Sequence, residues 1–199
     1  WWQELGAMYA DTVHQYSNAN YFNYLNNGVT NGWDWYEVNG GRQDFMNYFK
    51  FCRESTIELS NTKIPNPTTL PGFWNNNKSS LINYLKQSLY GLRGIITDSI
   101  TGQPLKARVE IFGHDFDSSH VYSNLPVGNY HRYIDQGNYS VNFSCSGYQS
   151  KSVDVAINNS STTILDVQLI PNSYVGIIQP ISQKKLINEF DILGRKGSL

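Results

Sequence analysis

The spacing of apolar residues changes once along this chain, at Tyr90-Gly91, and the change limits the folds open to it. Before this point, apolar residues recur every three or four positions in two stretches, which is the period of an amphipathic helix. After it, short runs alternate between apolar and polar residues, with glycine and asparagine between the runs, as in strands joined by turns. The sequence therefore predicts a helix-containing first part and an all-β second part.

Three helices and one strand are predicted in the first part. The first helix opens the chain, with apolar residues at helical spacing: Trp2, Leu5, Met8, Tyr9, Val13 and Tyr16. A short helix is expected over 43–51, and its inward side chains would be Phe45, Met46 and Phe49. The third would be capped by Ser79 or Ser80, and its apolar stripe would be Leu81, Tyr84, Leu85 and Leu89. The run 55–60 is predicted to be a strand, and three prolines make 63–71 an irregular connection.

In the second part, short strands are expected at five places, separated by turns that contain glycine or asparagine. These runs are 92–97, 107–112, 139–143, 153–157 and 164–170. Short strands at such regular spacing, with glycine-rich turns, are typical of a β-sandwich, here of about seven strands.

Composition excludes several classes of function. The net charge is −1 and only 16% of residues are charged, so a broad basic face for nucleic acid is not indicated. No run of 18 apolar residues is present, so no transmembrane segment is predicted. The two cysteines, Cys52 and Cys145, are far apart and show no metal-binding spacing, so buried free thiols are expected. Abundant tyrosine, asparagine and serine favour an extracellular surface.

One carboxylate has an unusual setting. Glu58 lies between Thr56-Ile57 and Leu59, in the run predicted to be a strand. An unpaired charge on a buried strand is costly, so the side chain either faces solvent by strand alternation or serves a function that offsets the cost. Alternation alone favours the solvent-facing interpretation.

Several separated motifs surround this acid in a defined order. They are GVTNG (28–32), Trp35-Tyr36, Gly40-Gly41, Gln43-Asp44, TIELS (56–60), Leu70-Pro71 and Phe73-Trp74-Asn75. Together they resemble the C-terminal half of the zinc carboxypeptidase catalytic domain, in particular its carboxypeptidase N/E branch and the branch's Bacteroidetes relatives. The resemblance implies an α/β fold for this part of the chain.

The resemblance also implies a role for five residues. Glu58 would be the general base and acid of peptide hydrolysis, taking a proton from a zinc-bound water and giving it to the leaving amine. Tyr36 would cover the bound substrate, although an ordinary half-buried aromatic residue is the alternative. Gly41, Arg42 and Gln43 would shape the pocket for the last side chain of a peptide or protein substrate. The branch commonly has methionine where Arg42 stands, which puts its preference for basic C-terminal residues in doubt here.

Zinc is the cofactor that the resemblance implies, and its two histidines and one glutamate are expected upstream of Trp1, with none in this chain. The opening on a helix without a cap suggests a cut. His14 is expected to be an ordinary helix residue. His114, His120 and His131 lie near aspartates, but their spacing matches no standard metal site. We predict that the isolated chain binds no catalytic zinc and has no peptidase activity.

The second part carries a resemblance of its own. GIITDSITGQPLKARVEI (94–111) and GNYHRYIDQGNYSVNFSCSGYQSKSV (128–153) resemble the transthyretin-like, or carboxypeptidase regulatory-like, domain. The predicted organisation is a catalytic part over 1–90, a transthyretin-like sandwich over 91–171 that docks on it, and a tail over 172–199. Residues 192–196 are similar to the start of a type IX secretion sorting domain, which implies secretion or cell-surface attachment. The alternative function is a non-enzymatic β-sandwich interaction module on an inactive peptidase remnant.

Overall fold

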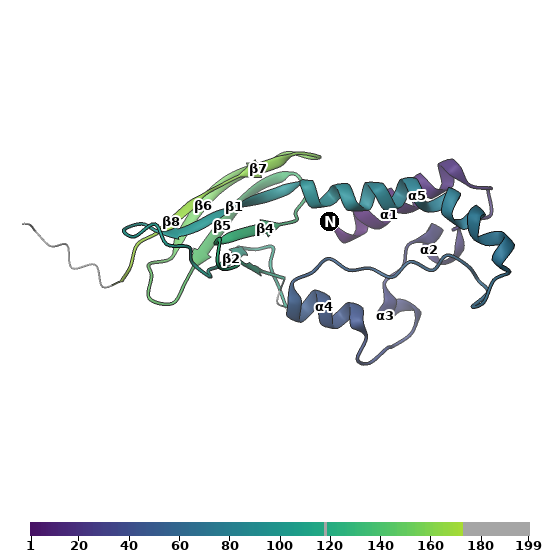
Figure 1. The fold of residues 1–199 in the computed structure, drawn as a ribbon, viewed down its shortest axis with the longest axis horizontal. Helices are drawn as coiled ribbons and strands as arrows, with labels where there is room; N and C mark the ends of the chain where they lie inside the picture. The colour runs from purple at the N-terminus through teal and green to yellow at the C-terminus, as the bar shows by residue number, and fades with distance from the viewer. Residues whose placement is uncertain (118, 173–199) are drawn as a thin grey trace, which may run out of the picture.

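The computed structural model describes residues 1–117 and 119–172. Helices gather at one end of an elongated molecule and strands at the other (Figure 1). The helices are α1 (Trp2–Tyr16), α2 (Tyr24–Gly28), α3 (Gly32–Trp35), α4 (Arg42–Lys50), η1 (Pro67–Thr69), α5 (Leu70–Lys86) and η2 (Gln87–Leu89). The strands are β1 (Gly91–Asp98), β2 (Arg108–Ile111), β3 (Val121–Tyr122), β4 (Asn129–Arg132), β5 (Gly137–Ser144), β6 (Lys151–Ile157), β7 (Thr162–Ile164) and β8 (Val167–Leu169). None of the described helices is both long and apolar enough to cross a membrane.

Helix α1 forms where helical spacing predicts it, and it packs along α5. Its buried face consists of Leu5, Tyr9, Ala10 and Val13. The matching face of α5 is polar, because its buried residues are Asn77 and Ser80. The Ser80 hydroxyl donates to the Tyr9 carbonyl at 3.0 Å, so the two helices are joined by a buried hydrogen bond as well as by packing.

The start predicted for the third helix, at Ser79 or Ser80, is wrong, because α5 begins at Leu70. Proline is compatible with the first turn of a helix, where its missing N–H has no partner to lose, and Pro71 occupies such a position. The preceding turn is capped by Asn66, whose side chain accepts from the Thr68 N–H at 3.0 Å. The predicted apolar stripe is also only partly correct, since Leu85 and Leu89 are exposed.

The short helix is confirmed as α4, but the predicted inward direction of two side chains is wrong. Phe45 and Phe49 are 48% and 61% exposed, whereas Met46 is half-buried. The strand predicted over 55–60 is also wrong, since the chain there has no regular secondary structure. A strand needs a partner for its backbone groups, and none of the described strands pairs with this stretch.

The second part of the chain forms two four-stranded sheets. In one, β1 lies between antiparallel β4 and parallel β7, and its second half pairs in parallel with β8. The other has the antiparallel order β3-β2-β5-β6. The run predicted as one strand over 164–170 is split between β7 and β8. The sequence also missed β3 and β4, which are only two and four residues long.

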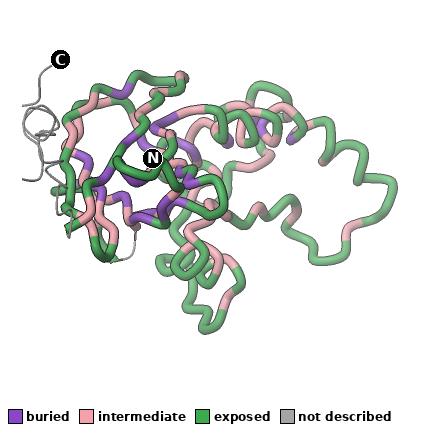
Figure 2. The backbone as a smooth tube through the Cα atoms, turned by 60° about the vertical axis from the view of Figure 1, so that its left-hand side comes forward, coloured by how far each residue is buried: buried purple, intermediate pink, exposed green. Residues whose placement is uncertain are grey.

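One apolar core receives side chains from both sheets, and most of the residues coloured as buried in Figure 2 lie in this β-rich region. Fully buried members include Leu92 and Ile96 from β1, and Val109, Val141 and Phe143 from the other sheet. The structure thus has helices followed by a β-rich region, and the transthyretin-like arrangement of that region stays a prediction. Cys52 and Cys145 are free, as expected, but half-buried instead of buried.

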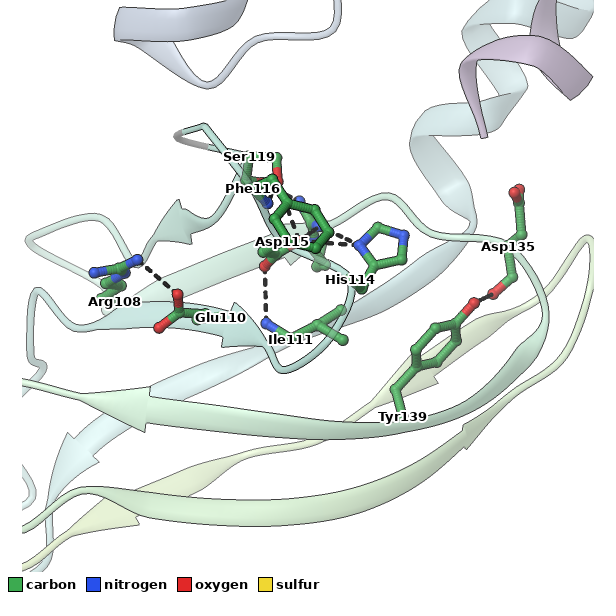
Figure 3. Close-up of polar contacts among 10 residues, drawn as sticks. Arg108, Glu110, Ile111, His114, Asp115, Phe116, Ser119, Asp135 and Tyr139 are labelled. Carbon is green, nitrogen blue, oxygen red and sulfur yellow. Dashed lines mark hydrogen bonds and ion pairs between the residues drawn. The ribbon is translucent and has the colours of Figure 1, made fainter.

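A buried ion pair organises the connection between β2 and β3. Asp115 accepts from the Ile111 N–H at 2.8 Å and from His114 Nδ1 at 3.0 Å (Figure 3). It also forms an ion pair with Arg132 on β4. The Asp115 and Arg132 side chains are each 2% exposed. Burial lowers the pKa of the Arg132 guanidinium, and the Asp115 carboxylate opposes that shift. This pair therefore ties Asp115, in the connection that follows β2, to β4 of the other sheet.

Candidate active site

Glu58, the predicted general base and acid, is exposed on the irregular backbone that follows α4. Within the described part of the chain, its carboxylate takes part in no hydrogen bond or ion pair. Its neighbours are held instead, because Thr56 Oγ1 donates to Gln43 Oε1 at 2.7 Å and the Tyr21 hydroxyl donates to the Leu59 carbonyl at 3.0 Å. These bonds hold the Thr56 side chain before Glu58 and the Leu59 carbonyl after it, and the Glu58 carboxylate is open to solvent.

Tyr36 directly follows α3, and its N–H donates to the Gly32 carbonyl at 3.0 Å. Its ring is 54% exposed and meets the ring of Trp35 edge-on at 4.6 Å. No contact described joins this ring to Glu58. Gly40 just beyond has a φ of +77°, a conformation that glycine adopts without strain, so the expected turn chemistry is present at that corner.

The three predicted pocket residues open α4. Gly41 precedes the helix, and its carbonyl accepts from the Phe45 N–H at 3.1 Å. Arg42 Nη1 lies 2.7 Å from Glu54 Oε1, and Gln43 binds Thr56 as described above. The first turn of α4 therefore holds two residues of the stretch that leads to Glu58. An open hollow on the same helix is lined by Gly40, Gly41, Arg42, Asp44, Phe45, Tyr48 and Phe49.

Sequence reasoning missed three residues that support this region. The Asn47 side chain on α4 forms two hydrogen bonds with the backbone of Glu54. Asn47 Nδ2 donates to the Glu54 carbonyl at 2.8 Å, and Asn47 Oδ1 accepts from the Glu54 N–H at 2.9 Å. Asn77 donates a hydrogen bond to the Tyr21 hydroxyl oxygen, and the Tyr21 hydroxyl donates to the Leu59 carbonyl. Asparagine is so common in this chain that neither position stood out, and Tyr21 lies in a polar stretch without periodicity.

The histidines are dispersed. His14 Nε2 lies 3.2 Å from the Phe22 carbonyl, His114 contacts Asp115, His120 faces Phe51, and His131 Nε2 lies 2.9 Å from the Tyr90 carbonyl. Burial lowers the pKa of both His120 and His131. Over residues 1–117 and 119–172, no three histidine, cysteine, aspartate or glutamate side chains are grouped so that they could hold a metal ion. The described residues therefore do not form a zinc site.

Comparison with known proteins shows which protein family this chain is similar to. Residues 1–80 match the family described as zinc carboxypeptidase. The chain is 40% identical over 148 residues to carboxypeptidase D of Drosophila melanogaster, covering 72% of this chain and 10% of that protein. It is 34% identical over 157 residues to the carboxypeptidase N catalytic chain of Rattus norvegicus, covering 79% of this chain and 33% of the relative. Carboxypeptidase E of Caenorhabditis elegans is 32% identical over 148 residues, covering 73% and 31% of the two chains.

Both the extent and the limits of these matches are informative. Aligned stretches of 148 and 157 residues are longer than the 80 residues of the family match, so the similarity continues into the β-rich region. In the other direction, the chain spans between 10% and 33% of the length of these relatives. The first 80 residues of this chain, which include the TIELS motif, therefore match the zinc carboxypeptidase family.

Proposed function

We propose that this chain carries the general base and acid of a metallocarboxypeptidase that removes C-terminal residues from peptides or proteins. The observation that carries the proposal is the pairing of α4 with the stretch before Glu58. Arg42 and Gln43, which are expected to shape the substrate pocket, bind Glu54 and Thr56. These contacts join the predicted pocket residues to the stretch that leads to Glu58. They span 12 positions from Arg42 to Glu54 and 13 positions from Gln43 to Thr56.

In this proposal, the Glu58 carboxylate accepts a proton from the attacking water and passes it to the nitrogen of the leaving residue. An exposed carboxylate is suited to meet water and substrate, and general acid–base catalysis contributes about 10²–10⁴-fold to rate. Tyr36, whose ring is also exposed, covers the substrate. Zinc would activate the water and polarise the carbonyl. The family's two histidines and one glutamate are expected outside this chain, so the 199-residue chain alone is proposed to bind no catalytic zinc and to be inactive.

The β-rich region is proposed to be a transthyretin-like sandwich that docks on the helical part. Phe51 supports this, since its ring lies 5.3 Å from that of His120 and 5.4 Å from that of Tyr122. The Arg53 guanidinium lies 5.8 Å from the Tyr133 ring centre, and burial lowers its pKa. Both residues precede Glu58 by only a few positions, so the docked sheets would steady the start of the catalytic stretch.

The decisive experiment is Glu58→Gln in the complete protein that carries this chain, assayed for release of C-terminal residues from peptides. We expect kcat to fall about 10²–10⁴-fold, while zinc content stays unchanged. Glu4→Gln, on the exposed side of α1, is the matched control and is expected to keep full activity. Activity of Glu58→Gln within threefold of the unsubstituted protein would refute the role of Glu58.

The second candidate is a non-enzymatic interaction module, and one observation favours it: no described contact connects Glu58 with Tyr36, whose ring meets Trp35 instead. The same assay separates the two candidates, because a module of this kind would release no residues even in the complete, zinc-loaded protein. Zinc analysis of the 199-residue chain is a further check, since stoichiometric, tightly bound zinc there would contradict the proposal that its ligands lie elsewhere.

We also infer that the protein is exported. Its low charge and its abundant tyrosine and asparagine support this, as does the resemblance of residues 192–196 to a type IX sorting segment, which lies outside the described residues. Fractionation of the producing cells tests the inference, with detection in the medium or at the cell surface as the expected result. Retention in the cytoplasm would contradict it.

A further inference from the structure

A chain of side-chain hydrogen bonds runs from the interface of α1 and α5 to the backbone beside Glu58. The Tyr9 hydroxyl donates to Asn77 Oδ1 at 3.0 Å, and Asn77 Nδ2 donates to the Tyr21 hydroxyl oxygen at 2.8 Å. The Tyr21 hydroxyl in turn donates to the Leu59 carbonyl at 3.0 Å. Four segments of the chain that are distant in sequence are thereby connected.

The direction of every bond follows from one contact. Asn77 Nδ2 also donates to the Phe73 carbonyl at 2.9 Å, and a carbonyl oxygen can only accept. The amide nitrogen must therefore face Phe73 and Tyr21, and its oxygen must face Tyr9. Because Tyr21 accepts from Asn77, its own proton is directed to the Leu59 carbonyl. All polar atoms of the Asn77 amide are satisfied, in a side chain that is 1% exposed.

Burial favours the protonated, hydrogen-bond-donating state of the two tyrosine hydroxyls. Tyr9 is 6% exposed, and burial raises the pKa of its hydroxyl to about 12, so the hydroxyl stays a donor at neutral pH. Burial also raises the pKa of Tyr21, while the bond from Asn77 lowers it. The Tyr21 ring is stacked on Phe73, with ring centres 6.0 Å apart and planes inclined by 24°. Two residues of α5 therefore hold Tyr21, Asn77 through its hydroxyl and Phe73 through its ring.

The stretch that receives this bond has few other restraints. It forms no strand, and Leu59 is 40% exposed. The hydrogen bond from Thr56 to Gln43 holds its beginning, and the bond from Tyr21 holds its end. Between these two tethers lies Glu58, whose carboxylate has no described partner to orient it.

We propose that Tyr21, oriented by Asn77 and Tyr9, is a positioning residue that holds the backbone of residues 58–60 in place. The inference rests on the proposed function only where Glu58 is taken as the catalytic acid and base. The backbone restraint itself does not depend on activity. Removal of the Tyr21 hydroxyl would free the Leu59 carbonyl while leaving the ring stacked on Phe73.

The test is ¹⁵N relaxation of the 199-residue chain with Tyr21→Phe. We expect order parameters of the Leu59 and Ser60 amides to fall from about 0.85 to below about 0.6, with unchanged values in α1 and α5. Tyr24→Phe, at the start of α2 and 69% exposed, is the matched control and should leave these amides rigid. Unchanged order parameters at Leu59 and Ser60 in Tyr21→Phe, or an equal loss of order throughout the chain, would overturn the proposal.

A second measurement separates this proposal from the proposed function. In the complete protein, Tyr21→Phe is expected to lower kcat about tenfold with little change in KM, because the substrate pocket on α4 is untouched. Loss of backbone order without any peptidase activity in the unsubstituted protein would support the tether and refute the enzyme. Normal kcat in Tyr21→Phe of an active protein would refute the positioning role.

Discussion

Asp115→Asn should destabilise the β-rich region severely. The substitution keeps the size and one acceptor of the side chain but removes the charge that balances Arg132. Since both side chains are 2% exposed, Arg132 would remain as a buried cation without a counter-charge. Removing one partner of a buried ion pair costs about 3–5 kcal/mol, a large share of the roughly 5–15 kcal/mol that stabilises a typical domain.

Urea unfolding at pH 7, followed by far-ultraviolet circular dichroism, measures this loss directly. The double variant with Arg132→Met removes both charges and should recover at least half of the lost free energy of unfolding, because no unbalanced charge stays buried. Glu110→Gln is the control, because the Glu110–Arg108 ion pair, at 2.7 Å, has side chains that are 26% and 40% exposed. Its loss should cost about 0–1 kcal/mol. A cost below about 1 kcal/mol for Asp115→Asn would refute the reasoning.

Three further predictions concern stability. A methyl group on Gly94 would lie 2.0 Å from the Leu165 carbonyl oxygen, so Gly94→Ala should lower the free energy of unfolding by about 1–3 kcal/mol; a neutral result in thermal unfolding would contradict this. Gly72→Ala, on α5 with open space around it, should instead stabilise by about 0.5–1 kcal/mol, and no gain in Tm would count against it. The pKa of Asp98 is lowered mainly by N–H bonds from Thr101 and Ile100, so its contribution is present above the ordinary aspartate pKa and lost as the pH falls through the folded value. Asp98→Asn should therefore lose less stability than the unsubstituted chain on acidification, and equal losses would show that Asp98 is not responsible.

The elements themselves were largely predictable from local patterns. The helical spacing of Leu5, Tyr9 and Val13 predicted α1, and all three are buried. The change of period at Tyr90-Gly91 marked the passage from η2, which ends at Leu89, to β1, which begins at Gly91. Such patterns work because the period reports which face of an element is covered, a property that each short stretch carries within itself.

The partners of those elements could not be obtained in this way. The stretch around Glu58 has the composition of a strand, yet no described strand lies beside it, because a ladder depends on a second segment that local composition does not specify. Asn77 is one of three consecutive asparagines at 75–77 and looks like a solvated helix residue. Its burial against Tyr9 and Tyr21, which are 68 and 56 positions away, arises only when α1, α5 and the loop between α1 and α2 come together. Hydrogen bonds across such separations depend on the packing of whole elements, and that packing determines how the backbone beside the candidate catalytic acid is held.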